Sequence, residues 1–452
     1  MARDVFIRLC ARPDGREDEQ VLEYHVTTSG ILGCYSNLPM TLLLGIKGIG
    51  KSTAFKVLTA EKREGFLISG YAPGAKRFDI RASLRPGLFR QRFYSLFLAA
   101  IISLIEKSDV GQSAEKRALT QLLGPLLDSV IKPAGEAIST ARSRVKGASA
   151  YGFGLTLDLS EDIEKKLDQF DCVAARTKVI SYAGRGISVR IFIDDPDQAL
   201  PVGEQGLNSL IGMILAANQI NINCNGVAGV TILLKTHVYR SVSGNEELAN
   251  IFPTQIGSLS WTREELIEAV DQRLKFANCS YDNVFALSKK DMGEKIVPLL
   301  RNGPRDLFAW IALAGNAAKG QKITHGHFQQ TTRDAGQFSL KQITTAYDNS
   351  VSSIPRLLKL VFSGRDLVGW DELVAIISDL RTNNPEFIEL NAKNTLDLSS
   401  EYAKFFLEAG TLEVMSGGLA TEPFGREYSG YGEIERKTKV RLHPLLAAAL
   451  LS

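Results

Sequence analysis

The stretch TLLLGIKGIGKSTAFKVLTAEK, residues 41–62, decides the fold. It begins with the short apolar run TLLL, continues through a glycine-rich turn, and ends in a segment whose Phe55, Val57 and Leu58 suit a helix packed on a sheet. A buried strand, a tight loop and a helix in this order are typical of the first unit of an α/β domain. We therefore predict a parallel sheet covered by helices.

The loop within this stretch, GIKGIGKS at 45–52, matches the pattern G-x-x-x-x-G-K-[ST]. Its glycines let successive backbone N–H groups turn toward phosphate oxygens, and the N-terminus of the following helix adds the positive end of its dipole. The pattern predicts a phosphate site for a nucleotide, formed by Gly45, Ile46, Lys47, Gly48, Ile49, Gly50, Lys51, Ser52 and Thr53.

Three side chains at the end of this loop have roles that follow from the motif. The Lys51 ammonium would reach the β- and γ-phosphates, the Ser52 hydroxyl would coordinate Mg²⁺, and Thr53 would lie near the α-phosphate. The alternative is a glycine-rich turn that matches by accident, and the flanking strand and helix argue against it. We therefore expect ATP and Mg²⁺ as the cofactors.

A second candidate site lies in VRIFIDDPDQA, residues 189–199. Asp194 ends the apolar run and is the predicted metal ligand, while Asp195 would act as the base or orient the attacking water. Asp197 is more typical of a helix N-cap. Asp158 also ends an apolar stretch, LTLDL, but glycines crowd that segment and its apolar run is shorter, so Asp194 is the stronger candidate.

The rest of the chain predicts an α/β core followed by helical domains. Further strands are expected at 65–69, 189–194 and 230–235, with helices at 88–106 and 204–217 between them. The long interval between Lys51 and Asp194 implies a helical insertion at about 107–184. We predict an α/β P-loop NTPase core with a parallel sheet over residues 1–260, a helical lid over 261–345 and a C-terminal winged-helix domain over 346–452.

The bulk composition limits the classes of protein. With 452 residues, 44% hydrophobic and 23% charged, the chain has the composition of a globular protein of two or three domains. The net charge of +3 predicts no general attraction to nucleic acid or to an anionic membrane. The longest apolar stretch, residues 96–105, is too short to span a membrane, and the five cysteines are scattered without a CxxC pair. We expect a cytoplasmic location and no membrane partner.

Five segments in order carry a resemblance to a known family: GIKGIGKS, IFIDDPD, VTILLKTHVYR, WTREELIEAVDQRL and RNGPRDLFAW. Over roughly residues 38–315 the chain resembles the AAA+-like signal-transduction ATPases called the STAND class. It is more distantly similar to the archaeal and eukaryotic origin-recognition ATPases. The resemblance implies an ATP-hydrolysing switch.

The resemblance also implies roles outside the loop. STAND proteins carry a GxP motif on the adenine side of the nucleotide, and Gly303-Pro304 is similar, although here the two residues are adjacent. In origin-type ATPases an arginine that opens a lid helix contacts the γ-phosphate, and Arg305 matches that place. Lys235, with Thr236, stands where these families have a γ-phosphate sensor; a strand end with solvated polar residues is the alternative.

The C-terminal hundred residues resemble a winged-helix domain, with helices expected at 354–362, 370–380 and 400–409 and a two-stranded wing between Leu412 and Leu442. Such a domain locks an off state in STAND proteins and binds DNA in origin proteins. The wing contains one basic cluster, formed by Arg436, Lys437, Lys439 and Arg441. The surrounding segments mix charge signs, so a solvated strand edge is favoured over DNA binding.

These observations leave three functional hypotheses. The leading one is a molecular switch that binds and slowly hydrolyses ATP and signals to a protein partner or to further copies of the chain. The others are an ATP-regulated DNA-binding protein of origin-recognition or transposition-helper type, and a nucleotide-binding subunit with negligible turnover. The pair His325 and His327 lacks accompanying ligands, so we expect it in a solvated loop and predict no metal besides Mg²⁺.

Overall fold

The structure is a computed structural model of the 452-residue chain. It describes residues 2–11, 20–36, 39–46, 48–60, 65–71, 86–107, 169–182, 186–198, 203–301, 303–347, 354–383, 399–416, 419–420 and 438–451, and the single residues 167 and 200. Their contacts form two compact units. One comprises Ser29–Leu44 and Lys51–Ser258, and the other comprises Met1–Thr28, Gly45–Gly50 and Leu259–Ser452.

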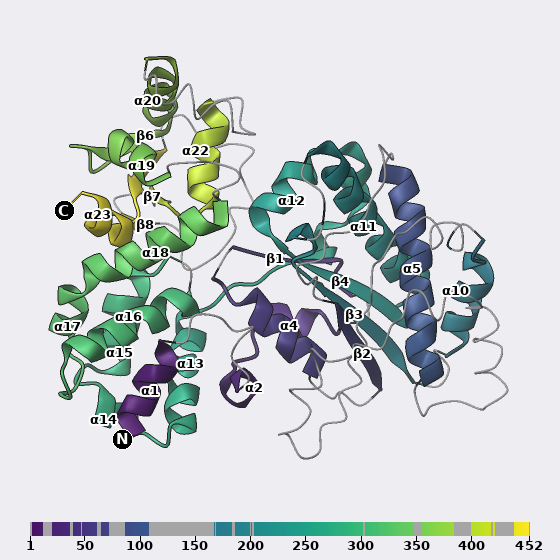
Figure 1. The fold of residues 1–452 in the computed structure, drawn as a ribbon, viewed down its shortest axis with the longest axis horizontal. Coiled ribbons are helices and arrows are strands. Elements are labelled where there is room, and N and C mark those ends of the chain that lie inside the picture. Colours follow the sequence, from purple (N-terminus) through teal and green to yellow (C-terminus); the bar gives the residue numbers. More distant parts are fainter. Residues whose placement is uncertain are drawn as a thin grey trace. The chain divides into compact units, whose positions relative to one another are not determined.

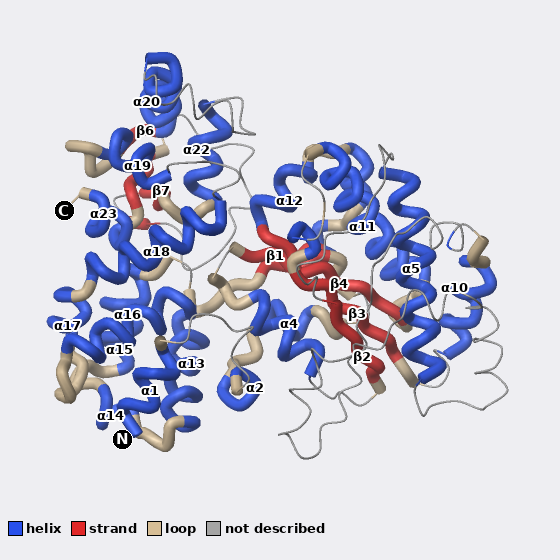
Figure 2. The backbone as a smooth tube through the Cα atoms, in the orientation of Figure 1, coloured by secondary structure: helices blue, strands red, loops and turns tan. Residues whose placement is uncertain are grey.

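The α/β unit is built on a five-stranded sheet with the order β2-β3-β4-β1-β5 (Figures 1 and 2). The strands are β1 (Leu42–Gly45), β2 (Phe66–Tyr71), β3 (Ser188–Asp194), β4 (Ala228–Lys235) and β5 (Ile256–Ser258). β2 pairs with β3, β3 with β4, and β1 with β5, each in parallel. The predicted α/β class with a parallel sheet is therefore confirmed.

The two central strands explain why this sheet is covered by helices. β3 and β4 are almost continuously buried and most of their residues are apolar, as expected of parallel strands covered on both faces. The longest helices of the unit, α5 (Pro86–Lys107) and α11 (Glu204–Asn223), pack against each other beside the sheet, and α4 (Lys51–Ala60) packs on β2 and β3 (Figure 1).

The remaining helical elements of the α/β unit are α3, α10, α12 and three 3-10 turns. Their bounds are Ser29–Gly33 (α3), Cys172–Ser181 (α10), Thr236–Ser243 (α12), Pro196–Gln198 (η3), Glu246–Asn250 (η4) and Pro253–Gln255 (η5). α10 falls within the predicted insertion; most of that insertion, including the weaker candidate Asp158, lies outside the described residues.

Helix α5 is the largely buried helix that the sequence predicts at 88–106. By length and composition, Pro86–Glu106 is also the one helix in the described part of the chain that could cross a membrane, with 78% of its most apolar window buried inside the protein. The core helix of a soluble protein meets the same criteria, so the finding does not identify a membrane span.

The second unit contains a helical core to which both ends of the chain contribute. Its elements are α1 (Ala2–Cys10), α2 (Val21–Tyr24), α13 (Arg263–Phe276), α14 (Tyr281–Val284), α15 (Lys289–Asp291), the π-helix η6 (Met292–Ile296), η7 (Val297–Leu299), α16 (Pro304–Ala317), α17 (His325–Gln330) and α18 (Thr332–Tyr347). Phe6 packs edge-on against Phe285, with ring centroids 6.0 Å apart, and Tyr24 lies 5.3 Å from Phe276. Helices α1 and α2 thus pack with helices we assigned to the lid, whose boundaries at 260 and 345 remain predictions.

The histidine pair lies in this helical core and differs from the expected solvated loop. His325 is the first residue of α17, and His327 closes a capping box with Thr324. The Thr324 N–H donates to Nδ1 of His327 over 3.1 Å. The spacing of the two histidines therefore reflects a helix start, and the described residues contain no group of three or more His, Cys, Asp or Glu side chains that could hold a metal ion.

The C-terminal part has its own core, formed by helices and a small sheet. The helices are α19 (Ile354–Phe362), α20 (Trp370–Asn383), α22 (Ser399–Glu408) and α23 (Pro444–Leu450), and the strands are β6 (Val368–Gly369), β7 (Leu412–Ser416), β8 (Leu419–Ala420) and β9 (Lys439–Leu442). The antiparallel sheet has the order β6-β9-β7-β8. Three helices and a strand pair lie at the predicted places, and the sheet has additional short strands, while the winged-helix assignment stays a prediction.

Candidate functional site

The loop after β1 has the backbone conformation that its glycines allow. Gly48 and Gly50 have φ angles of +92° and +106°, in the left-handed region that favours glycine. Ile46 and Ile49 are buried, and α4 begins directly after the loop at Lys51. The predicted order of strand, loop and helix is present, and Lys47 lies outside the described residues.

Lys51 is buried at the start of α4, with a side chain surrounded by charges. The residue is 6% exposed. Burial lowers the pKa of Lys51, and the charges of Asp195, Asp194 and Asp197 oppose this while that of Lys235 adds to it. The α/β unit therefore brings the predicted loop lysine together with the predicted acidic residues and the predicted sensor. An anionic phosphate here would stabilise the charged form of the buried ammonium.

The two carboxylates that follow β3 differ in backbone conformation. Asp194 is the last residue of the strand, opposite Leu233 of β4, and is fully buried. Asp195 donates its N–H to the Leu233 carbonyl over 3.0 Å and has a φ of +43°, an uncommon value for a residue other than glycine. Strain of this kind often occurs at functional sites. Asp195 thus leaves the extended backbone conformation that Asp194 has at the end of β3.

Asp197 does not cap a helix, contrary to the prediction. It lies in the short turn η3, and the N-cap position of α11 is occupied by Gly203. The Asp197 carboxylate instead accepts a hydrogen bond from Nζ of Lys235 over 2.7 Å, and each side chain is 17% exposed. Asp197 is thus the ion-pair partner of the predicted sensor, a role that the sequence does not reveal.

The end of β4 lies at the same edge of the sheet as the end of β3, because the strands run parallel. Lys235 ends β4, and the next residue, Thr236, is buried. The pKa of His237 is lowered to about 3, first by burial and then by the charges of Lys235 and Lys51, so its ring is neutral at pH 7. A buried threonine and an ion-paired lysine do not fit the alternative of a solvated strand end.

Within the helical unit, to which Gly45–Gly50 belongs, the tip of the loop contacts Trp261, a residue to which the sequence assigns no role. Nε1 of Trp261 donates a hydrogen bond to the carbonyl oxygen of Ile49 over 2.7 Å. Gly303, with a φ of +71°, is close to both residues: a Cβ at this position would lie 3.4 Å from Ile49 Cδ1 and 3.4 Å from Trp261 Cδ1. Pro304, the predicted adenine-side residue, follows as the first residue of α16.

Arg305 occupies the first turn of α16, as the sequence predicts. Its Nη1 donates a hydrogen bond to Oε1 of Gln342 on α18 over 3.0 Å. This contact joins the start of α16 to α18. The γ-phosphate role of Arg305 and the adenine-side role of Pro304 stay predictions.

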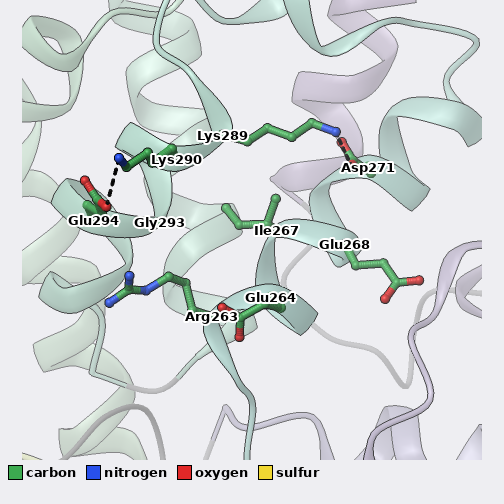
Figure 3. Close-up of a pocket in the computed structure, with 9 residues that line it drawn as sticks. All are labelled: Arg263, Glu264, Ile267, Glu268, Asp271, Lys289, Lys290, Gly293 and Glu294. Carbon is green, nitrogen blue, oxygen red and sulfur yellow. Dashed lines mark hydrogen bonds and ion pairs between the residues drawn. The ribbon is translucent and has the colours of Figure 1, made fainter.

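A pocket of about 430 Å³ lies elsewhere in the helical unit, between α13 and the segment 289–294 (Figure 3). Its lining mixes both charge signs, with ion pairs from Lys289 to Asp271 at 2.6 Å and from Lys290 to Glu294 at 3.9 Å. None of the predicted site residues lines it. The pocket is therefore not the predicted nucleotide site.

Comparison with known proteins gives only distant likenesses. No family model matches the chain, and neither does any curated protein. Among solved structures, the chain is similar to the Aeropyrum pernix ORC2 protein in its ADPNP–ADP complexes, with 12% identity and a TM-score of 0.36 over 96% of this chain and 97% of that one.

Two further solved structures show a likeness of the same degree. The Walker-type ATPase paby2304 of Pyrococcus abyssi has 12% identity and a TM-score of 0.38, over 98% of this chain and 96% of that one. Cdc6p from Pyrobaculum aerophilum has 13% identity and a TM-score of 0.31, over 99% and 96%. At this identity and TM-score, the likeness gives no information on individual residues.

Proposed function

We propose that the chain is a molecular switch of AAA+ type that binds ATP with Mg²⁺ at residues 45–53 and hydrolyses it slowly. The observation that carries the proposal is the buried Lys51 ammonium, which follows a loop with two left-handed glycines and lies among the charges of Asp194, Asp195 and Lys235. A buried cation at a helix N-terminus beside glycine-rich backbone is the arrangement that binds phosphate.

The residues present fit the chemistry of Mg²⁺-dependent hydrolysis. Mg²⁺ prefers hydroxyl, carboxylate and water oxygens, and Ser52 and Asp194 supply the first two. The bound ion would neutralise charge on the β- and γ-phosphates. Asp195 would orient the attacking water, and Lys235 would donate to the γ-phosphate in exchange for its present partner, Asp197.

The output is proposed to be a change in the C-terminal part that a protein partner or a further copy of the chain recognises. DNA is less favoured as the partner. Arg441, one of the basic residues of the wing, donates to Glu413 over 2.7 Å, so its charge is already compensated. The sequence of α22, SSEYAKFFLE, also contains more acidic than basic residues, which opposes contact with phosphates.

A reducing compartment, the cytoplasm, is proposed as the location. All five cysteines are free thiols, and Cys10, Cys34 and Cys224 are buried. Burial raises the pKa of Cys10 and of Cys34 to about 12, so these thiols are unreactive in the folded chain.

The test is a steady-state phosphate-release assay with ATP, with and without Mg²⁺, accompanied by a nucleotide-binding titration. We expect Mg²⁺-dependent turnover that is slow, in line with a switch. Tight ATP binding without any turnover would instead indicate a nucleotide-binding subunit. Salt-dependent binding of duplex DNA that requires ATP would favour the DNA-binding alternative.

A further inference from the structure

Trp261 and the loop tip are joined by a hydrogen bond across 212 residues of sequence. The indole N–H donates to the Ile49 carbonyl over 2.7 Å, Ile49 is fully buried, and the Trp261 ring is partly buried against the helical core. A Cβ on Gly50 would lie 3.8 Å from the same ring. The indole is therefore hydrogen-bonded to the Ile49 carbonyl and lies near Gly50.

The indole is held in place by the start of α13. Trp261 directly precedes the N-cap residue Thr262, whose hydroxyl accepts from the N–H of Glu265 over 3.1 Å, while the Glu265 carboxylate accepts from the N–H of Thr262 over 2.7 Å. An apolar residue before such a capping box commonly packs on the first buried residue of the helix, here Leu266. Trp261 and Leu266 belong to the same apolar cluster.

Because the peptide unit is planar, the hydrogen bond from Trp261 to the Ile49 carbonyl also fixes the direction of the Gly50 N–H. The Ile49–Gly50 bond is trans, so the Ile49 carbonyl and the Gly50 N–H point in opposite directions from one plane. Because the carbonyl is fixed on the indole, the Gly50 N–H must face away from Trp261. The left-handed φ of Gly50 lets the chain continue from this orientation into Lys51 and α4.

We infer that Trp261 is a positioning residue for the phosphate loop, which holds the Ile49–Gly50 peptide so that the Gly50 N–H is presented to the phosphates of a bound nucleotide. The inference rests on the proposed nucleotide site and adds to it a residue far outside the motif. In this arrangement, one peptide unit, Ile49–Gly50, separates the Trp261 indole from the bound phosphates.

The experiment measures the affinity for ADP and ATP by calorimetry in the wild type, Trp261→Phe and Trp310→Phe. Trp261→Phe keeps one aromatic ring but removes the N–H donor together with part of the indole ring, and Trp310→Phe loses the same ring area. Trp310 is the matched control, because its Nε1 also donates to a backbone carbonyl, that of Phe328 at 3.1 Å, in the same helical core and away from the loop. We expect Trp261→Phe to weaken both nucleotides about five- to tenfold, as loss of one hydrogen bond predicts.

Trp310→Phe should lower the melting temperature and leave both affinities unchanged. In a Trp310→Phe/Trp370→Phe protein, where Trp261 is the one remaining tryptophan, ADP should change the emission spectrum, and adding Lys51→Ala should abolish that change. A merely structural role of Trp261 would not produce this signal.

The outcomes separate this inference from the proposed function. If the wild type binds nucleotide and Trp261→Phe binds it equally well, Trp261 does not position the loop and the nucleotide site stands. Equal weakening by both Phe variants would show a general effect of core stability and would also overturn the inference. A folded wild type that binds neither ADP nor ATP would overturn the proposed function, and this inference with it.

Discussion

Asp194 and Asp195 are adjacent carboxylates with different backbone conformations and different proposed roles, so their substitutions should have different effects. Asp194→Asn should weaken Mg²⁺-dependent ATP binding, because it removes the charge proposed to hold the ion. Asp195→Asn should retain ATP and lower kcat about 100-fold, because only the water-orienting group is changed. Binding titrations with and without Mg²⁺, beside single-turnover hydrolysis, measure both effects.

A different pattern of effects at these carboxylates would show that the metal site is elsewhere. Small and equal effects of the two substitutions, together with a large effect of Asp158→Asn, would place the metal on another segment of the chain. The structure already favours the Asp194–Asp195 segment over Asp158, since the charges of both carboxylates act on the buried Lys51.

The residues that the sequence predicts differ in kind from those it misses. Lys51, Asp194 and Lys235 are found because each lies at the end of a strand or the start of a helix, where local pattern and position agree. Trp261 and Asp197 are missed because their partners, Ile49 and Lys235, are distant in sequence. No hydrophobic periodicity and no motif spacing in the sequence indicates either of these two contacts.

At the scale of elements, hydrophobic patterning accounts for most of the fold. The predicted helix at 354–362 coincides with α19, and the apolar runs ending at Asp194 and Lys235 coincide with the ends of β3 and β4. The packing of α1 and α2 with the lid helices was not predictable, because amphipathic helices indicate a buried face without indicating the partner. Domain boundaries predicted from the sequence are uncertain for the same reason, since the sequence does not indicate which helices pack together.

The helical core and the C-terminal core are joined by the buried Arg301. Its Nε donates to Ser339 of α18 over 2.9 Å, and its Nη1 donates to the Ala409 carbonyl at the end of α22 over 2.7 Å. Ser339 in turn donates to Asp306 of α16 over 3.2 Å, and Arg301 Nε lies 3.9 Å from the same carboxylate. One cation thus connects three helices of the second unit.

Arg301→Met should therefore lower the free energy of unfolding by about 3 kcal/mol, because it leaves the buried Asp306 carboxylate without its cation. The exposed Arg365, which follows α19 and donates to the Val361 carbonyl of that helix, is the matched control, and Arg365→Met should cost less than about 0.5 kcal/mol. Urea unfolding measures both. Equal small losses would show that the two cores are stable without this connection.

For the whole molecule, the buried His443 predicts how stability depends on pH. The pKa of His443 is lowered to about 3, first by burial and then by the charges of Arg301 and Arg441, while a hydrogen bond with the Leu300 backbone opposes them. The unfolded chain takes up this proton near pH 6.5, whereas the folded chain does not. The contribution of neutral His443 is therefore complete above pH 6.5 and is lost as the pH falls toward 3.

His443→Gln cannot take up the proton, so its unfolding free energy should fall less steeply between pH 6 and pH 4, by up to about 1.4 kcal/mol per pH unit. Urea unfolding at a series of pH values gives the two slopes. Identical slopes for wild type and variant would mean that His443 is protonated in the folded protein as readily as in the unfolded chain.

The central claim is that Lys51 binds the phosphates of ATP, and calorimetric titration of Mg²⁺-ATP into the wild type and Lys51→Ala tests it most directly. Lys56→Ala, five residues further along α4, is the control for loss of a lysine on the same helix. We predict that Lys51→Ala weakens binding about 100-fold or more, as loss of a buried charged contact implies, and that Lys56→Ala leaves it unchanged. A folded Lys51→Ala protein that binds ATP as tightly as the wild type would contradict the account.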